Sequence, residues 1–470
     1  MTAPQGATRH PASWRDPSGF IYRRDGVLLR QVQPVFLKDW AEFRDSALAK
    51  RLVAGGQLLP WQDAPLGDAF DDSAAAVIRP EVVPFISYPY EWTFGQLRDA
   101  ALLTLDVQAT ALGMGWTLKD ATAYNVQYRG VRPVLIDHLS FQRLPPDSPW
   151  VAYQQFCEHF LAPLALMSRR DIRMGRMLRD QLDGIPLDLA ASLLPGRTKL
   201  RLGLGAHVHL HARSQRSHAG DARKPTQVKI SLTRLTALVE SLRGTVAGLK
   251  WEPSGTEWAD YADKDHASYE GGSPDAKEAI VRDLLVAAGD MSGRDPGRMA
   301  WDLGANTGRF SRIAADLGYR VLSFDIDPAA AERHYRALRT ADRTDTTPLV
   351  MDLADPSPGL GWAGAERSSF VERANADVIL ALALVHHLAI GRNVPLPMVM
   401  DLFADLAPQV IVEWVPRGDP MVDILLASRE DVFTDYTTEG FEAAAGLRFE
   451  VRSRTPIEGS PRVLYHLVRR

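Results

Sequence analysis

The sequence contains very little cysteine, no long hydrophobic run and no marked excess of charge of either sign. Cys157 is the single cysteine in 470 residues, so neither an intrachain disulfide nor a cysteine-based zinc or iron–sulfur site can form. The longest uninterrupted apolar stretch, residues 378–385, is far shorter than the roughly 20 residues that span a membrane. Residues 1–19 are polar and do not resemble a secretory signal. We therefore expect a cytoplasmic protein without a membrane segment.

The charges of the chain are nearly balanced. Lys and Arg number 54 and Asp and Glu 58, a net charge of −4, which is too even for a dedicated nucleic-acid-binding protein. We expect a small-molecule substrate and no nucleic-acid partner, and the sequence leaves the oligomeric state open. No metal site is predicted, because His207, His209 and His211 have no carboxylate or cysteine beside them.

The composition is that of a folded globular protein, with 46% hydrophobic and 24% charged residues, and the length suits two or three domains. Residues 213–226 are rich in Ser, Gly, Arg, Lys and Pro, which is typical of an exposed linker. From 230 to 249, apolar residues recur at helical spacing. We predict an N-terminal accessory domain over 1–212, a linker and amphipathic helix over 213–250, and a catalytic domain over 251–470.

From residue 275 onward, apolar runs alternate with helical segments, which indicates a parallel α/β sheet covered by helices on both faces. A doubly wound, Rossmann-like sheet of this kind binds its ligands beyond the carboxyl ends of its strands. The last two strands are predicted to form an antiparallel hairpin at the sheet edge. The predicted strands are 299–303, 320–324, 349–351, 377–382, 409–414, 448–453 and 462–468, and the predicted helices are 308–317, 328–339 and 395–406.

The first of these strands runs into a turn that reads DLGANTG from residue 302 to residue 308, and a helix follows. Gly304 and Gly308 allow a ligand to approach the backbone closely, and Asn306 is the residue type besides glycine that best tolerates a positive φ. Free N–H groups at the helix start should point into the crevice. The spacing is that of neither a dinucleotide fingerprint nor a P-loop. The carboxylate of Asp302 before the turn suits a ligand that carries an ammonium group.

Two more carboxylates follow the next strands of the predicted sheet. Asp325 ends the second strand, where an acid can accept hydrogen bonds from both hydroxyls of a ribose. Asp352 follows the third strand, and Leu353 comes next. This pair suits an adenine ring, because the carboxylate can accept from its amino group while the leucine packs on the ring. Together the acids indicate a nucleoside site.

In this order, the motifs resemble those of class I S-adenosylmethionine-dependent methyltransferases over about residues 270–470. The resemblance implies S-adenosyl-L-methionine as the cofactor and a seven-stranded sheet in the order 3-2-1-4-5-7-6. Asn306 departs from the pattern, since many members have glycine there. The cofactor-binding residues that the resemblance implies are Asp302, Gly304, Ala305, Asn306 and Gly308 for the methionine part, Asp325 for the ribose, Ile326, Asp352 and Leu353 for the adenine, and Ala381 and Leu382 for the floor. Residues 413–422 and 428–433 resemble a bacterial group related to rhizobial host-specific nodulation proteins.

Methyl transfer is an in-line displacement, so the protein mainly positions the acceptor and removes a proton from it where needed. His386 and His387 follow the fourth strand, where the acceptor should lie, and an imidazole can act as a base near neutral pH. The alternative is that one histidine packs on the sheet and the other caps a turn. Glu413, near the end of the fifth strand, is a further candidate. We predict transfer to an oxygen or nitrogen atom of a small or sugar-like molecule.

The N-terminal half weakly resembles protein kinases and aminoglycoside phosphotransferases. Asp120, Asn125 and Asp137 have the order, and nearly the spacing, of the residues that orient an acceptor hydroxyl and hold Mg²⁺ in those enzymes. Lys38 ends an apolar run, 35–37, which we predict as the strand that carries their phosphate-binding lysine. We expect an α+β domain of kinase-like fold. Because no glycine-rich loop precedes Lys38, we expect this domain to bind the substrate or to regulate the enzyme. Phosphotransferase activity in this half and a non-catalytic scaffold are the alternatives.

Overall fold

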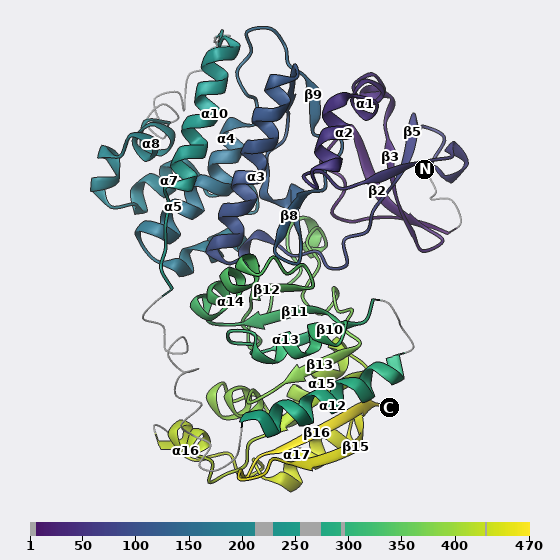
Figure 1. Ribbon diagram of the computed structural model, residues 1–470, viewed down its shortest axis with the longest axis vertical. Coiled ribbons are helices and arrows are strands. Elements are labelled where there is room, and N and C mark those ends of the chain that lie inside the picture. The colour runs from purple at the N-terminus through teal and green to yellow at the C-terminus, as the bar shows by residue number, and fades with distance from the viewer. Residues whose placement is uncertain (1–5, 212–228, 254–273, 293–296, 428–429) are drawn as a thin grey trace. The chain divides into compact units, whose positions relative to one another are not determined.

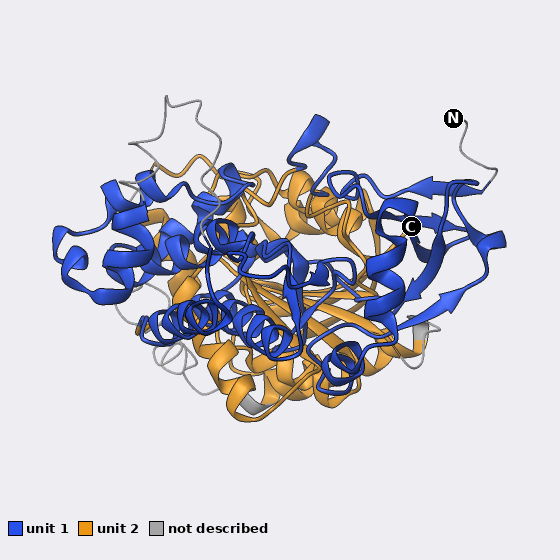
Figure 2. Ribbon diagram, turned by 90° about the horizontal axis from the view of Figure 1, so that it is seen from above, with its two compact units in different colours: residues 1–251, 359–368 blue, residues 252–358, 369–470 orange. Residues whose placement is uncertain are grey.

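The chain forms two compact units, which we describe separately (Figure 1). Unit 1 comprises residues 1–251 and 359–368, and unit 2 comprises residues 252–358 and 369–470 (Figure 2). The segment 359–368 therefore belongs to unit 1, although it interrupts unit 2 in the sequence. The computed structural model describes residues 6–211, 229–253, 274–292, 297–427 and 430–470.

Unit 1 includes the amphipathic helix that the sequence predicted between the two domains. The linker predicted over 213–226 lies outside the described residues, but the amphipathic helix is present as α10 (Leu232–Ala247). Helix α10 packs against α3 (Phe94–Gly113), so it is part of unit 1 rather than of a separate linker segment. The side chains that it buries recur every three or four residues, as the sequence predicted: Leu235, Val239, Leu242 and Val246.

Unit 1 begins with a five-stranded antiparallel sheet in the order β1-β2-β3-β5-β4. The predicted strand at 35–37 is wrong. Pro34 opens a 3₁₀ turn (Pro34–Phe36) that leads into α1 (Leu37–Arg44), and Phe36, Trp40 and Phe43 are buried at helical spacing. The strands of this sheet are β1 (Ala7–Arg9), β2 (Gly19–Arg24), β3 (Val27–Val32), β4 (Trp61–Ala64) and β5 (Ala76–Pro80).

The rest of unit 1 is mainly helical, with two small antiparallel ladders, β6-β9 and β7-β8. Helix α3 starts with a capping box in which Thr93 accepts from the Gln96 N–H, and it is buried along most of its length. The ladders follow it directly and place the loop between β6 and β7 next to the residues after β8. The elements are α2 (Ala47–Ala54), β6 (Trp116–Leu118), β7 (Val126–Arg129), β8 (Arg132–Leu135), β9 (Phe141–Arg143), α4 (Tyr153–Phe156), α5 (Ala162–Arg169), α6 (Met177–Asp180), α7 (Leu187–Leu193) and α8 (Leu202–Leu204).

Unit 2 is built on a seven-stranded sheet in the order β12-β11-β10-β13-β14-β16-β15. Counted within the unit, this is 3-2-1-4-5-7-6, the order that the resemblance implied. The first five strands are parallel, and the last two form the antiparallel hairpin predicted at the edge. The strands are β10 (Met299–Leu303), β11 (Arg320–Asp325), β12 (Thr346–Val350), β13 (Val378–Ala381), β14 (Gln409–Trp414), β15 (Phe449–Pro456) and β16 (Val463–Arg469).

Apolar side chains cover both faces of this sheet, which explains why its strands read as continuous apolar runs. On one face, Ala300 and Val321 pack against α12 and α13. On the other face, the rings of Trp301, Phe324 and Phe370 lie 5.1–5.2 Å apart. The helices are α12 (Pro274–Ser292), α13 (Arg309–Asp316), α14 (Pro328–Thr340), α15 (Leu396–Leu406), α16 (Pro420–Ala427) and α17 (Thr438–Gly446).

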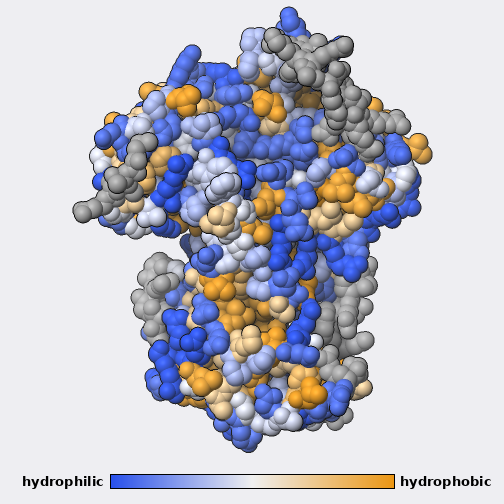
Figure 3. Space-filling view, turned by 180° about the vertical axis from the view of Figure 1, so that it is seen from behind, coloured by the Kyte–Doolittle hydropathy of each residue, from blue (hydrophilic) through white to orange (hydrophobic). Residues whose placement is uncertain are grey.

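Seen from behind, the surface is mostly hydrophilic with hydrophobic side chains scattered among the polar ones (Figure 3). Leu200 and Leu202 are examples of exposed apolar residues. Among the described residues, no helix combines the length and the apolar character that crossing a membrane takes.

Candidate functional site

The turn between β10 and α13 adopts an unusual backbone conformation. Gly304, Asn306 and Gly308 have φ values of +77°, +49° and +81°. The asparagine therefore does adopt the positive φ for which the sequence singled it out. The N–H groups of Gly304 and Ala305 both donate to the carbonyl oxygen of Phe324, at 2.8 and 3.0 Å. These bonds hold the turn at the carboxyl end of the neighbouring strand β11.

Gly308 has a second reason to be glycine, which the sequence does not reveal. A Cβ at this position would lie 2.0 Å from Nε2 of His334, a buried residue of α14. Nδ1 of His334 lies 3.2 Å from the hydroxyl of Ser323. Burial, assisted by the nearby Arg312, lowers the pKa of His334 to about 4, so the ring is neutral at physiological pH. The neutral imidazole therefore packs directly against the turn at Gly308.

The carboxylate of Asp325 lies directly against this turn. Its Oδ2 accepts from the N–H of Asn306 at 2.7 Å, and its Oδ1 accepts from the N–H of Asp327 at 2.8 Å. Burial outweighs these bonds and raises the pKa of Asp325 to about 6. The acid and the glycine turn thus meet at the carboxyl ends of the neighbouring strands β10 and β11, although Asn306 and Asp325 lie 19 residues apart in the chain.

Asp302, at the end of β10, is more deeply buried than a surface binding residue. Its Oδ2 accepts from the hydroxyl of Ser311 in α13 at 2.6 Å. Burial and the nearby charge of Asp325 raise the pKa of Asp302 to about 6. The bond to Ser311 ties the strand to the helix that follows the turn, so Asp302 also has a structural role that the motif did not indicate.

The residues implied for adenine binding differ in how open they are. Ile326 is 43% exposed beside Asp325. Asp352 accepts from the N–H of Ala354 at 3.0 Å and pairs with Arg392 at 3.2 Å, so its carboxylate already has partners. Leu353 follows it and is half-buried.

The implied floor of the site lies at the end of β13, the neighbour of β10. Ala381 is fully buried and Leu382 nearly so. Two residues further on, Leu384 reaches under the turn: its Cδ1 lies 3.4 Å from where a Cβ of Gly304 would be. The apolar surface therefore continues from β13 beneath the glycine turn.

His386 is a buried polar side chain without a partner. Its side chain is almost fully enclosed, yet neither ring nitrogen has a hydrogen-bond partner among the described residues. The ring of His387 lies 4.0 Å away, at the start of a π-helical turn (His387–Gly391). Burial, and then the charges of His387, Arg462 and Lys277, lower the pKa of His386 well below its ordinary value. A polar ligand or an ordered water molecule would satisfy its nitrogens.

Glu413, by contrast, has both carboxylate oxygens engaged. Lys277 of α12 lies 2.5 Å from Oε2, and Arg462, just before β16, lies 3.4 Å from Oε1. Arg462 also pairs with Asp419 at 2.7 Å, and all four side chains are buried. The structure therefore favours a positioning role for Glu413 over the role of a free base. Its partners are 49 and 136 residues away in the chain, so no local sequence pattern predicts them.

In unit 1, Lys38 is not a phosphate-binding residue on a strand. It lies in the first turn of α1 with an exposed side chain, because the segment at 34–44 is helical. The basic side chain at the acidic site is Arg30 of β3, which the sequence reasoning missed. Asp137 pairs with Arg30 and accepts from the hydroxyl of Ser140. The side-chain amide of Asn125 lies 3.4 Å from the Ser140 oxygen and also hydrogen-bonds Asp120.

The three C-terminal histidines of unit 1 do not share a face. Residues Gly205–Leu210 form a π-helical turn. His207 contacts the hydroxyls of Tyr153 and Ser241 at 2.8 and 2.9 Å, and His209 contacts Thr198 at 2.8 Å. Nowhere in the described part of the chain do three His, Cys, Asp or Glu side chains gather as metal ligands would.

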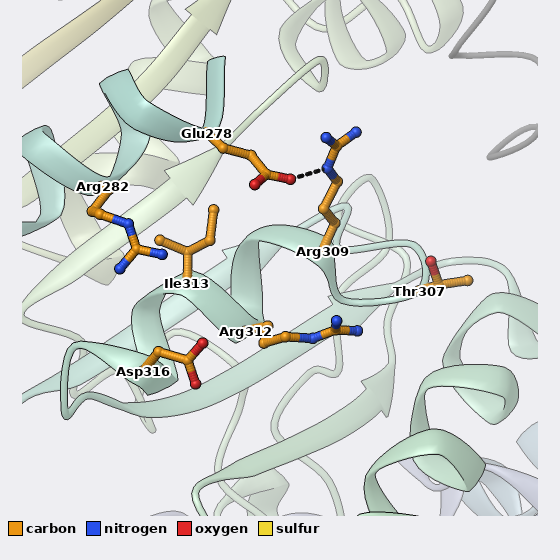
Figure 4. A pocket seen from close by; sticks show the side chains of 7 residues that line it. All are labelled: Glu278, Arg282, Thr307, Arg309, Arg312, Ile313 and Asp316. Atoms are coloured by element: carbon orange, nitrogen blue, oxygen red, sulfur yellow. Dashed lines mark hydrogen bonds and ion pairs between the residues drawn. The ribbon is translucent and has the colours of Figure 1, made fainter. Parts of the chain in front are cut away.

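A shallow surface groove borders the glycine turn on its outer side (Figure 4). Arg309 pairs with Glu278 across it at 2.5 Å, and Thr307 is the residue of the turn that lines it. Three arginines and two carboxylates share this groove, and we assign it no ligand. The remaining lining residues are Arg282, Arg312, Ile313 and Asp316.

Comparison with known proteins reveals a relative over nearly the whole chain. The nodulation protein NoeA of Rhizobium meliloti (strain 1021) is 35% identical over 469 residues, which cover 97% of this chain and 95% of the relative. No family model matches the chain.

Solved structures resemble about two fifths of the chain. A magnesium protoporphyrin IX methyltransferase from Synechocystis PCC 6803 with bound SAH is 16% identical, covering 45% of this chain and 96% of that one, with a TM-score of 0.32. The N-methyltransferase NodS from Bradyrhizobium japonicum WM9 is 14% identical, covering 41% and 96%, with a TM-score of 0.29. Because both TM-scores lie below 0.5, we argue function from the chain's own residues.

Proposed function

This chain belongs to the family of the nodulation protein NoeA, and we propose that its unit 2 is an S-adenosylmethionine-dependent methyltransferase. The proposed acceptor is an oxygen or nitrogen atom of a small or sugar-like molecule. The observation that carries the proposal is the contact between the glycine turn and Asp325, where the N–H of Asn306 donates to the carboxylate at 2.7 Å.

The residues around this contact fit the cofactor. Gly304 and Gly308 have no side chain to cover the turn, so a ligand can approach its backbone closely. The N–H groups of Gly304, Ala305 and Asn306 are bonded to Phe324 and Asp325 and fix the shape of the turn. The carboxylate oxygens of Asp325 each accept one backbone N–H and keep a second lone pair for a ribose hydroxyl. Ile326 is open enough to cover one face of an adenine ring. When bound, S-adenosyl-L-methionine supplies a methyl carbon on a positively charged sulfur.

In this proposal His386 accepts the proton that the acceptor loses. Its lowered pKa keeps the ring neutral at physiological pH, and both nitrogens lack partners among the described residues. A hydroxyl or amine of the acceptor would satisfy one of them. Lys277 and Arg462, whose charges lower the pKa of His386, are both paired with Glu413.

For unit 1 we propose an accessory role in binding the acceptor or regulating the transfer. The support is the path of the chain: the segment 359–368 connects β12 to β13 of unit 2 but belongs to unit 1. Within unit 1, the buried carboxylate of Glu366 accepts two hydrogen bonds from Arg15, at 2.7 and 3.0 Å. An Arg15→Met variant with unchanged cofactor affinity and unchanged methyl transfer would argue against this role.

Calorimetric titration of the full chain with S-adenosylhomocysteine tests the main proposal. The unmodified chain should bind, and Asp325→Ala should weaken binding more than tenfold, because two charge-assisted hydrogen bonds are lost. Asp405→Ala is the matched control, since Asp405 is an exposed carboxylate of the same unit on α15. An unmodified chain that binds no S-adenosylhomocysteine would leave only a non-catalytic scaffold.

A further inference from the structure

Unit 1 contains a buried ion pair at the place where the sequence suggested a metal-binding acid. Nη2 of Arg30, on β3, lies 2.5 Å from Oδ1 of Asp137, just after β8. Only 8% of the arginine side chain and 11% of the aspartate side chain are exposed. Nε of Arg30 is also buried and has no hydrogen-bond partner among the described residues. The guanidinium thus sits inside a polar site rather than at the surface.

Oxygen atoms converge on this site from three parts of the chain. The hydroxyl of Ser140 donates to Oδ2 of Asp137, and the side-chain amide of Asn125 lies 3.4 Å from the Ser140 oxygen. Asn125 also hydrogen-bonds the carboxylate of Asp120. Carboxylate, amide and hydroxyl oxygens are the ligands that hard divalent cations such as Mg²⁺ prefer. The oxygen atoms of this cluster are therefore of the kind that binds a cation.

The pKa shifts of the two carboxylates also indicate that the cluster favours a positive charge. Burial, and next the charge of Asp137, raise the pKa of Asp120, which is the mark of two carboxylates in one poorly hydrated place. Burial alone would raise the pKa of Asp137 as well, but the charge of Arg30 and bonds from Ser140 and Leu139 hold it below its ordinary value. For Asp137, the compensating positive charge is already present on Arg30.

We propose that the guanidinium of Arg30 is the resident cation of the Asp120–Asn125–Asp137 cluster, so that unit 1 takes up no divalent metal there and needs none to fold. A divalent ion bound to Asp137 would have to displace the guanidinium or share the carboxylate with it. Two positive charges that share one buried carboxylate repel each other strongly. Unit 1 would then carry out no metal-dependent phosphoryl transfer. This inference does not depend on the methyltransferase activity of unit 2.

The proposal predicts that removing the charge of Arg30 creates a metal-binding site. Mn²⁺ is titrated into the full chain, with the spin-resonance signal of free Mn²⁺ and the melting temperature as readouts. The unmodified chain should take up no Mn²⁺ in unit 1. Arg30→Gln removes the cation at nearly constant polarity, so it should lower the melting temperature, bind Mn²⁺ and regain several degrees with it. Arg30→Lys, which keeps the charge, should fold and stay insensitive to Mn²⁺.

The double variant Arg30→Gln/Asp137→Asn identifies the site, because it should lose any Mn²⁺ response that Arg30→Gln gains. Two results would overturn the proposal: Mn²⁺ uptake by the unmodified chain that Asp137→Asn abolishes, or a folded Arg30→Gln chain that ignores Mn²⁺. The first of these needs no Arg30 variant, so the proposal stays refutable even if Arg30→Gln does not fold.

Discussion

Replacing Gly308 with alanine should damage the glycine turn more than the same change at any open glycine of unit 2. An alanine at φ +81° pays about 1–2 kcal/mol for the left-handed conformation. Its Cβ would also lie 2.0 Å from Nε2 of His334, and relieving such overpacking costs about 1–3 kcal/mol more. We therefore expect a loss of about 2–5 kcal/mol in the free energy of unfolding of unit 2, and a tenfold or greater loss of S-adenosylhomocysteine affinity.

Gly318 provides the matched control. It has nearly the same φ, +86°, but a Cβ there would meet nothing within 4 Å, so Gly318→Ala reports the conformational cost alone. Urea unfolding and calorimetric titration of the full chain measure both effects. Combining Gly308→Ala with His334→Ala should cost less than the two single changes added together, because the collision disappears. Equal losses in Gly308→Ala and Gly318→Ala, with unchanged affinity in both, would refute this reasoning.

Four further outcomes follow from the geometry of unit 2. Because the folded pKa of Asp325 is raised to about 6 from an unfolded value of about 3.9, the native state binds more protons between these values, and stability falls as pH rises through this window. Ribose hydroxyls donate better to the ionised acid, so the affinity for S-adenosylhomocysteine should be highest above pH 7 and fall as the pH drops through 6. Calorimetry measures this dependence, and the Asp325→Asn variant should not show it. Lys277→Met should lower the free energy of unfolding by about 3–5 kcal/mol, because it leaves a carboxylate oxygen of Glu413 buried and unpaired. The urea transition should therefore move to a lower urea concentration. Arg448→Met, at an exposed ion pair, should change the transition little. His386→Asn should slow the formation of S-adenosylhomocysteine by methyl transfer while leaving its affinity intact, and an unchanged rate would assign the proton to another group.

The sheet of unit 2 was largely predictable, because strands that are buried on both faces appear as uninterrupted apolar runs. Two predicted strands, β10 and β14, have the predicted bounds, and the ends of the others differ by at most three residues. The turn was predictable for a different reason: Gly304, Asn306 and Gly308 are residue types that tolerate a positive φ, and all three adopt one. Local conformational preference and local burial are properties that a sequence displays directly.

What the sequence did not reveal are partners that come together only in the fold. His334 supports Gly308, Lys277 neutralises Glu413, and Arg30 neutralises Asp137, in each case from another element. The predicted strand before Lys38 failed because an apolar run of three residues fits a helix as well as a strand, and Pro34 decided in favour of the helix. The kinase-like nature of unit 1 stays a prediction.

Hydrogen exchange of the full chain with and without S-adenosylhomocysteine tests the central claim most directly. If the glycine turn after β10 and the acid at the end of β11 bind the ligand, the amides at 304–308 and 325–327 should exchange more slowly when the ligand is present. The amides of the hairpin β15–β16 should exchange at the same rate with and without it. Binding without protection at these two segments, or protection confined to other parts of the chain, would contradict the account.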